Sequence, residues 1–98
     1  MPAYLIAEQE ITDPETFEKY REISSRTIAQ HGGRFIVRGG AVEPLEGGWV
    51  PKRLVIVEFP TMEQARRWYS SAEYAPGIKL RQTASTGRSI LVEGLSSD

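Results

Sequence analysis

Alternating and β-branched apolar runs predict strands in four parts of the chain. Residues 4–11 begin almost continuously apolar, which is typical of a strand buried on both faces. Residues 34–38, 52–59 and 88–94 are rich in β-branched and aromatic side chains. Gly39 and Gly40 interrupt the second run, which residues 41–43 would continue.

A 3.6-residue period predicts a first helix that ends at about residue 30 or 31, before Gly32 and Gly33. The start of this helix can be interpreted in two ways. Either Asp13 caps the helix with Pro14 in the first turn, or Thr12 and Glu15 form a capping box. The predicted inward stripe consists of Phe17, Tyr20, Ser24, Thr27, Ile28 and His31, with Ile23 at its edge.

Thr61 and Gln64 predict a capping box for a second helix. Its predicted inward side carries Met62, Ala65, Tyr69 and Ala72, with Trp68 at the edge. Residues 75–77 break this helix, and a short helical segment is expected from residue 78 to about 83. Residues 95–98 are expected to fray.

The resulting order is βαββαβ, so we expect one α+β domain over residues 1–98 with a ferredoxin-like antiparallel sheet. Both helices then cover one face of the sheet. Strand alternation gives that face Leu5, Ala7, Phe35, Val37, Val55, Val57 and Phe59. The opposite face receives Tyr4, Ile6, Glu8, Ile36, Arg38, Leu54, Ile56 and Glu58.

Large apolar side chains on the second set form a patch that a solvent-facing sheet would not normally carry. Ile6, Ile36, Leu54 and Ile56 belong to it. Two copies whose sheets pack face to face would bury this patch, so a homodimer is predicted. The small size of a 98-residue chain also favours burial through oligomerisation.

Composition excludes several classes of function. Twelve Lys and Arg against 13 Asp and Glu give a net charge of -1, so no nucleic-acid or membrane partner is expected. No cysteine and a single histidine argue against thiol chemistry and against a metal or other cofactor. The short apolar start lacks the features of a signal peptide, so the expected location is the cytoplasm.

Several motifs together resemble one family. The run from Gly32 to Gly40, GGRFIVRGG, is similar to the signature GGRFLVRGG of the "domain of unknown function 1330" family. Further similar segments are residues 58–60, 65–69, 71–74 and 91–94. The resemblance implies a dimeric α/β barrel, a superfamily of ferredoxin-like homodimers. It also implies that some relatives are cofactor-independent monooxygenases, isomerases or degradative enzymes, without naming a reaction for this chain.

The best candidate constellation is Arg38 with Glu58 and Glu8, placed by alternation on neighbouring strands of one face. In the functional reading Arg38 holds a carboxylate or enolate oxygen and a glutamate serves as acid or base. Gly39 and Gly40 would let a ligand approach the backbone. In the structural reading the charges form an ion pair at the dimer interface.

Other candidates have weaker patterns. His31 is either a general base or a helix-terminal cap. Trp68, Tyr69 and Tyr74 either line an aromatic pocket or pack in the core, with Tyr69 the most core-like. Arg81 either reaches an anionic ligand or is solvated.

Two functions therefore remain open. The leading one is a homodimer that binds a small, anionic organic molecule, with cofactor-independent acid/base or oxygenase-type chemistry as its catalytic form. The alternative is a non-catalytic dimeric module, structural or regulatory, whose charges only fix the interface.

Overall fold

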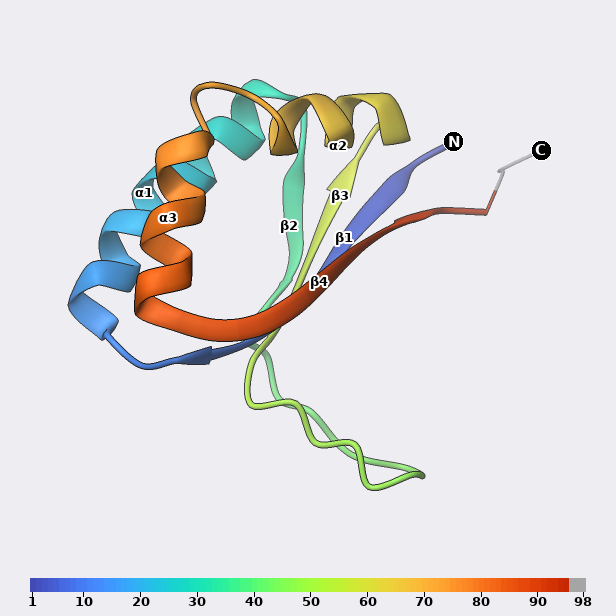
Figure 1. Ribbon diagram of the computed structural model, residues 1–98. Coiled ribbons are helices and arrows are strands. Elements are labelled where there is room, and N and C mark those ends of the chain that lie inside the picture. Colours follow the sequence, from blue (N-terminus) through green and yellow to red (C-terminus); the bar gives the residue numbers. More distant parts are fainter. Residues whose placement is uncertain (96–98) are drawn as a thin grey trace.

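The computed structural model describes residues 1–95 and consists of a four-stranded antiparallel sheet with helices on one of its faces (Figure 1). The elements are β1 Ala3–Ile11, α1 Pro14–Gln30, β2 Arg34–Arg38, β3 Leu54–Phe59, α2 Met62–Tyr69, α3 Ala75–Ala84 and β4 Ser85–Glu93. The expected ferredoxin-like α+β fold is confirmed, and the short helical segment forms a full third helix that begins at Ala75.

The strands lie in the order β2-β3-β1-β4, so the two central strands are β3 and β1. β4 begins at Ser85, three residues before the predicted start, and pairs with the whole length of β1. Gly87 makes this extension possible, because a side chain there would collide with the backbone of Glu8. The polar composition of residues 85–89 hid this part of the strand from the sequence pattern.

A β-bulge in β2 changes which side chains face the helices. Phe35 pairs with Val57, but the next paired residue is Val37, which stands opposite Ile56, and Arg38 stands opposite Val55. The one-residue shift moves Val37 to the open face and Arg38 to the helix-covered face. The alternation that placed Arg38 on the same face as Glu58 is therefore wrong for Val37 and Arg38.

The ends of α1 follow one of the two predicted readings. Asp13 is the N-cap, and its carboxylate accepts hydrogen bonds from the backbone N–H of Thr16 at 3.3 Å and from the Thr16 hydroxyl at 2.7 Å. These bonds lower the pKa of Asp13. At the other end Gly32 adopts a φ of +80°, which glycine accepts without strain.

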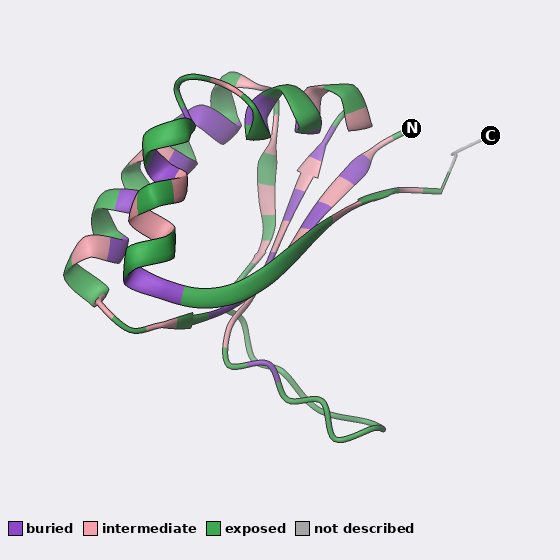
Figure 2. Ribbon diagram, in the orientation of Figure 1, coloured by how far each residue is buried: buried purple, intermediate pink, exposed green. Residues whose placement is uncertain are grey.

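The core lies between the helices and the covered face of the sheet, where the buried residues gather (Figure 2). The inward stripe of α1 is confirmed for Phe17, Tyr20, Ser24, Thr27 and Ile28. On α2 Ala65 is buried as predicted, but the predicted places of the two aromatic residues are wrong: Trp68 is 1% exposed at the centre of the core, while Tyr69 is 42% exposed. The indole N–H of Trp68 donates to the Thr27 hydroxyl at 3.0 Å, which satisfies the only polar atom of this side chain.

The face of the sheet opposite the helices is open in the single chain and strongly apolar. Ile36, Ile90 and Val92 are 45%, 61% and 40% exposed there, beside the half-buried Ile6 and Ile56. Between β2 and β3 an irregular arm of residues 39–53 extends away from the domain (Figure 1) and exposes Leu45 and Trp49. Within residues 1–95 the helices are too short or too polar to cross a membrane.

We expect Phe17→Ala to lower the free energy of unfolding by about 3–5 kcal/mol, because it empties a packed position in the core. The exposed Lys19, two residues away on α1, provides a matched control. Lys19→Ala should change the free energy by less than about 0.5 kcal/mol. Urea denaturation of both variants measures the difference, and equal losses would contradict the observed helix phase.

Candidate functional site

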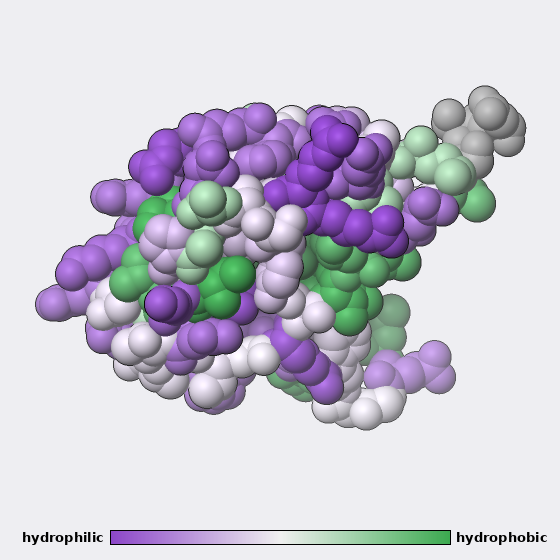
Figure 3. All heavy atoms as spheres, turned by 45° about the horizontal axis from the view of Figure 1, so that its top comes forward, coloured by the Kyte–Doolittle hydropathy of each residue, from purple (hydrophilic) through white to green (hydrophobic). Residues whose placement is uncertain are grey.

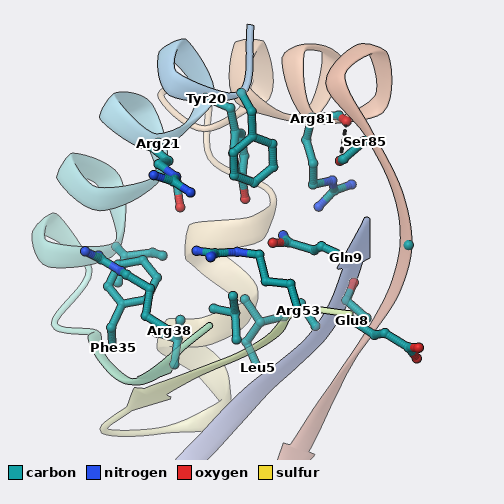
Figure 4. A pocket seen from close by; sticks show the side chains of 18 of the residues that line it. Leu5, Glu8, Gln9, Tyr20, Arg21, Phe35, Arg38, Arg53, Arg81 and Ser85 are labelled. Carbon is teal, nitrogen blue, oxygen red and sulfur yellow. Dashed lines mark hydrogen bonds between the residues drawn. The ribbon is translucent and has the colours of Figure 1, made fainter. Parts of the chain in front are cut away.

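A cavity of about 400 Å³ lies between α1, α3 and the covered face of the sheet (Figure 4). Leu5, Val55 and Val57 supply its apolar floor from the two central strands. Phe17 and Tyr20 on α1 form an apolar part of the cavity wall. A space of this size, partly apolar and partly polar, suits a small organic molecule.

Five arginines line this cavity: Arg21 from α1, Arg38 from β2, Arg53 just before β3, Arg81 from α3 and Arg88 from β4. Within residues 1–95 one acidic residue, Glu8, belongs to the lining. Its carboxylate accepts from Arg88 Nε at 2.9 Å and points away from the cavity in Figure 4. The interior of the cavity is therefore cationic, with no carboxylate of the described lining directed into it.

Arg53 is the least compensated of these cations. Its Nε is buried and has no hydrogen-bond partner among the described residues. Burial lowers the pKa of Arg53, and the nearby positive charges of Arg21 and Arg38 lower it further. Gly39 makes room for this side chain, because a Cβ at that position would collide with the guanidinium group.

The neighbouring arginines are held by stacking and by weaker polar contacts. The Arg38 guanidinium lies 3.6 Å from the centre of the Phe35 ring and donates to the Ser25 hydroxyl at 3.5 Å. This stacking holds the planar group without using its inner donors. Arg21 donates to Glu18 at 2.8 Å on the outer side of α1, while its buried Nε has no partner.

Two tyrosine hydroxyls stand on the α3 side of the cavity. Tyr20 and Tyr74 are hydrogen-bonded to each other at 2.9 Å, and Arg81 donates to Tyr74 at 3.4 Å. Burial raises the pKa of the Tyr74 phenol, and the adjacent Tyr20 raises it further, so Tyr74 stays protonated. Burial acts to lower the pKa of Arg81, but the contacts with Tyr74 and Tyr69 raise it overall.

The predicted grouping of Arg38 with Glu58 and Glu8 does not form. Glu58 lies on the open face, where it accepts from Arg34 Nε at 2.9 Å and from the Tyr4 hydroxyl at 3.3 Å. Glu8 lies on the same face with Arg88. The bulge explains the separation. It places Arg38 on the helix-covered face, while both glutamates stay on the open face that alternation predicts.

The remaining candidates divide between the cavity and its surroundings. Trp68, Tyr69, Tyr74 and Arg81 all line the cavity. His31 lies outside the lining, with its Nδ1 bonded to the Thr27 carbonyl at 2.8 Å, so it occupies the predicted position of a helix-terminal cap. Gly39 supports Arg53, whereas Gly40 has open space around it. Among residues 1–95 no cluster of His, Asp and Glu could hold a metal ion.

The lining includes polar residues that the sequence pattern did not single out, among them Arg53, Arg21 and Gln9. Gln9 is 8% exposed and its Oε1 has no partner among the described residues. The alternation of Leu5 and Ala7 already placed Gln9 on the inward face. A polar residue at such a core position could therefore have indicated a polar site there. Arg53 gave no such signal, because its role depends on the bulge and the path of residues 39–53.

Solved structures of similar fold are available at low sequence identity. A protein of unknown function from Rhodopseudomonas palustris has a TM-score of 0.78 at 18% identity, covering 97% of this chain and 83% of that one. SnoaB, a cofactor-independent oxygenase from Streptomyces nogalater, has a TM-score of 0.65 at 13% identity, with coverage of 98% and 95%. A dimeric protein of unknown function from Bacteroides fragilis has a TM-score of 0.62 at 10% identity, with coverage of 95% and 96%.

These similarities and the strand order define the protein as a ferredoxin-like α+β domain. The family profile described as "Domain of unknown function (DUF1330)" matches residues 2–95, and the chain belongs to that family. No protein of curated function is significantly similar to it in sequence.

We expect Arg53→Met to leave the fold intact and to make it equally or more stable, because the change removes a partly buried cation that has no counter-charge among residues 1–95. Thermal denaturation at low ionic strength measures the effect. Lys52→Met, at the exposed neighbouring position, should instead weaken an exposed ion pair with Glu10 and change little. A large loss of stability in Arg53→Met would show that Arg53 has a structural role.

Proposed function

We propose that this protein is a homodimer whose subunits each bind a small organic anion in the cavity between the helices and the sheet. One observation carries the proposal: Arg38, Arg53 and Arg81 line the cavity without an acidic partner among residues 1–95, and the one carboxylate of the described lining is directed outwards. Charged groups taken out of water without a partner destabilise a fold. An anionic ligand would supply the missing counter-charge.

The chemistry of the lining narrows the ligand to an amphipathic molecule. Leu5, Val55 and Phe17 offer an apolar surface, while Arg38 and Arg53 offer donors that suit a carboxylate, phenolate or enolate oxygen. A flat apolar body with an acidic group satisfies both regions. An inorganic anion would leave the apolar region unfilled.

The described cavity favours binding and charge stabilisation over proton transfer by a side chain. It contains no imidazole, and its one acid is directed outwards. A cofactor-independent oxygenation of the bound molecule is the catalytic extension that the fold similarity to SnoaB supports. In that reaction the arginines would stabilise an anionic form of the substrate.

The open face of the sheet supports the dimer. Ile36 on β2 and Ile90 and Val92 on β4 expose apolar surface, with the half-buried Ile56 and Ile6 on the two strands between them, and a similar fold from Bacteroides fragilis is a dimer. The ion pairs Arg34–Glu58 and Arg88–Glu8 lie on this same face. They fit the structural reading of the two glutamates, as charges that fix the register of two packed sheets.

The binding proposal predicts that naphthoate binds and that its neutral alcohol analogue, naphthalenemethanol, binds at least about tenfold more weakly. Isothermal titration calorimetry at low salt measures both. Arg38→Met should weaken naphthoate binding by about tenfold or more. Arg26→Met, an exposed arginine of α1 outside the cavity, is the control for lost charge and should have little effect. Equal binding of acid and alcohol, or an unaffected Arg38→Met variant, contradicts the proposal.

The dimer proposal predicts a mass of twice 11.0 kDa for the wild-type protein in light scattering at micromolar concentration. Ile90→Lys places a charge in the open apolar face and should yield a folded monomer. Glu22→Lys, on the exposed side of α1, should remain a dimer. A monomeric wild-type protein would disprove the face-to-face arrangement.

A further inference from the structure

The arginines of the cavity form two separate groups. Arg38 and Arg53 come from β2 and the start of β3, on one side of the sheet order, and Arg21 lies near them. Arg81 comes from α3, which leads directly into β4 at the opposite edge. Figure 4 shows Arg21 and Arg38 on one side of the cavity and Arg81 on the other. The surroundings differ too, because Arg81 is accompanied by tyrosines and not by other arginines.

Charge compensation separates these side chains further. Arg21 already has an ion pair with Glu18, on the outer side of its helix. Arg38, Arg53 and Arg81 make no ion pair with any of residues 1–95; their polar contacts there are with neutral hydroxyls or are missing. Both ends of the cavity therefore lack a negative charge. A ligand with one acidic group would compensate only one end.

We infer that the ligand is a dianion with an apolar middle, such as an aromatic dicarboxylate. This inference rests on the proposed function and specifies its substrate class. The first acidic group binds to Arg38 and Arg53. The second binds to Arg81, whose guanidinium is positioned by Tyr74. The apolar side chains of the floor and of α1 contact the body of the ligand between them.

The geometry of each end fits this assignment. Stacking on Phe35 leaves the edge of the Arg38 guanidinium free for in-plane hydrogen bonds to a carboxylate. The Tyr20–Tyr74 pair holds the hydroxyls beside Arg81 in fixed places, so these groups lose little conformational freedom when an oxyanion binds. Lysines would not offer the same planar recognition at either end.

The test compares dicarboxylates with matched monocarboxylates by isothermal titration calorimetry at low salt. Terephthalate is paired with benzoate, and a linear naphthalene dicarboxylate with naphthoate, so that two ligand lengths are covered. We expect at least one dicarboxylate to bind about tenfold or more tightly than its partner, the range for a charge-assisted hydrogen bond in a partly buried site.

Substitutions at Arg81 test whether the second acidic group of the ligand binds at this end of the cavity. Arg81→Met should reduce the affinity of the dicarboxylate to that of the monocarboxylate while leaving the monocarboxylate within about threefold of its wild-type affinity. Lys79→Met, an exposed cation on the same helix, controls for net charge and should preserve the difference. Arg81→Gln provides a second, polar replacement, and circular dichroism checks the fold of each variant.

The outcomes separate the two proposals. If monocarboxylates and dicarboxylates bind equally and Arg81→Met affects neither, the dianion inference is overturned while the anion-binding function stands. If no carboxylate binds to the wild-type protein, both are overturned. A dicarboxylate preference that survives Arg81→Met also overturns the inference, because the second acidic group must then bind elsewhere.

Discussion

The candidate site depends on the β-bulge in β2. Without the extra residue between Phe35 and Val37, strict alternation would turn Arg38 to the open face and place Val37 against the helices. The bulge thus converts an apolar position of the core into a cationic one. Gly39 follows directly in the chain, and its missing side chain leaves space for Arg53. The bulge and this glycine together position two of the five arginines of the lining.

The fold tolerates these cations because the aromatic core next to them is closely packed and its indole N–H is hydrogen-bonded. Trp68 lies against Tyr74 with ring centres 4.1 Å apart, and its indole N–H is bonded to Thr27. Phe59 and Ile28 are buried beside this cluster. Trp68, Tyr74 and Ile28 also line the cavity, so this packed part of the core forms one wall of the candidate site.

The fold was predictable because its signals are local. Asp13 and Pro14, the inward stripe of α1 and the capping residue Thr61 each act within one turn of helix, and the structure follows them. The family resemblance was confirmed over residues 2–95. The site was less predictable because it depends on register and on a distant segment. No residue near Arg38 indicates the bulge in the sequence. Arg53 reaches the cavity only because of the path that residues 39–53 take. On α2, the buried hydrogen bond of Trp68 outweighed the simple periodicity that favoured Tyr69.

The charged side chains on the two faces of the sheet differ in whether they have a partner of opposite charge. On the open face Glu58 accepts from Arg34 and Glu8 accepts from Arg88, so these pairs are complete within one chain. On the covered face the half-buried Arg53 and Arg81 have no acidic partner among residues 1–95, although burial makes an unpaired charge there more costly. A fold under selection for stability alone would favour the reverse distribution. The proposed anionic ligand would compensate these unpaired cations, and the proposed dimer would account for the paired charges on the open face.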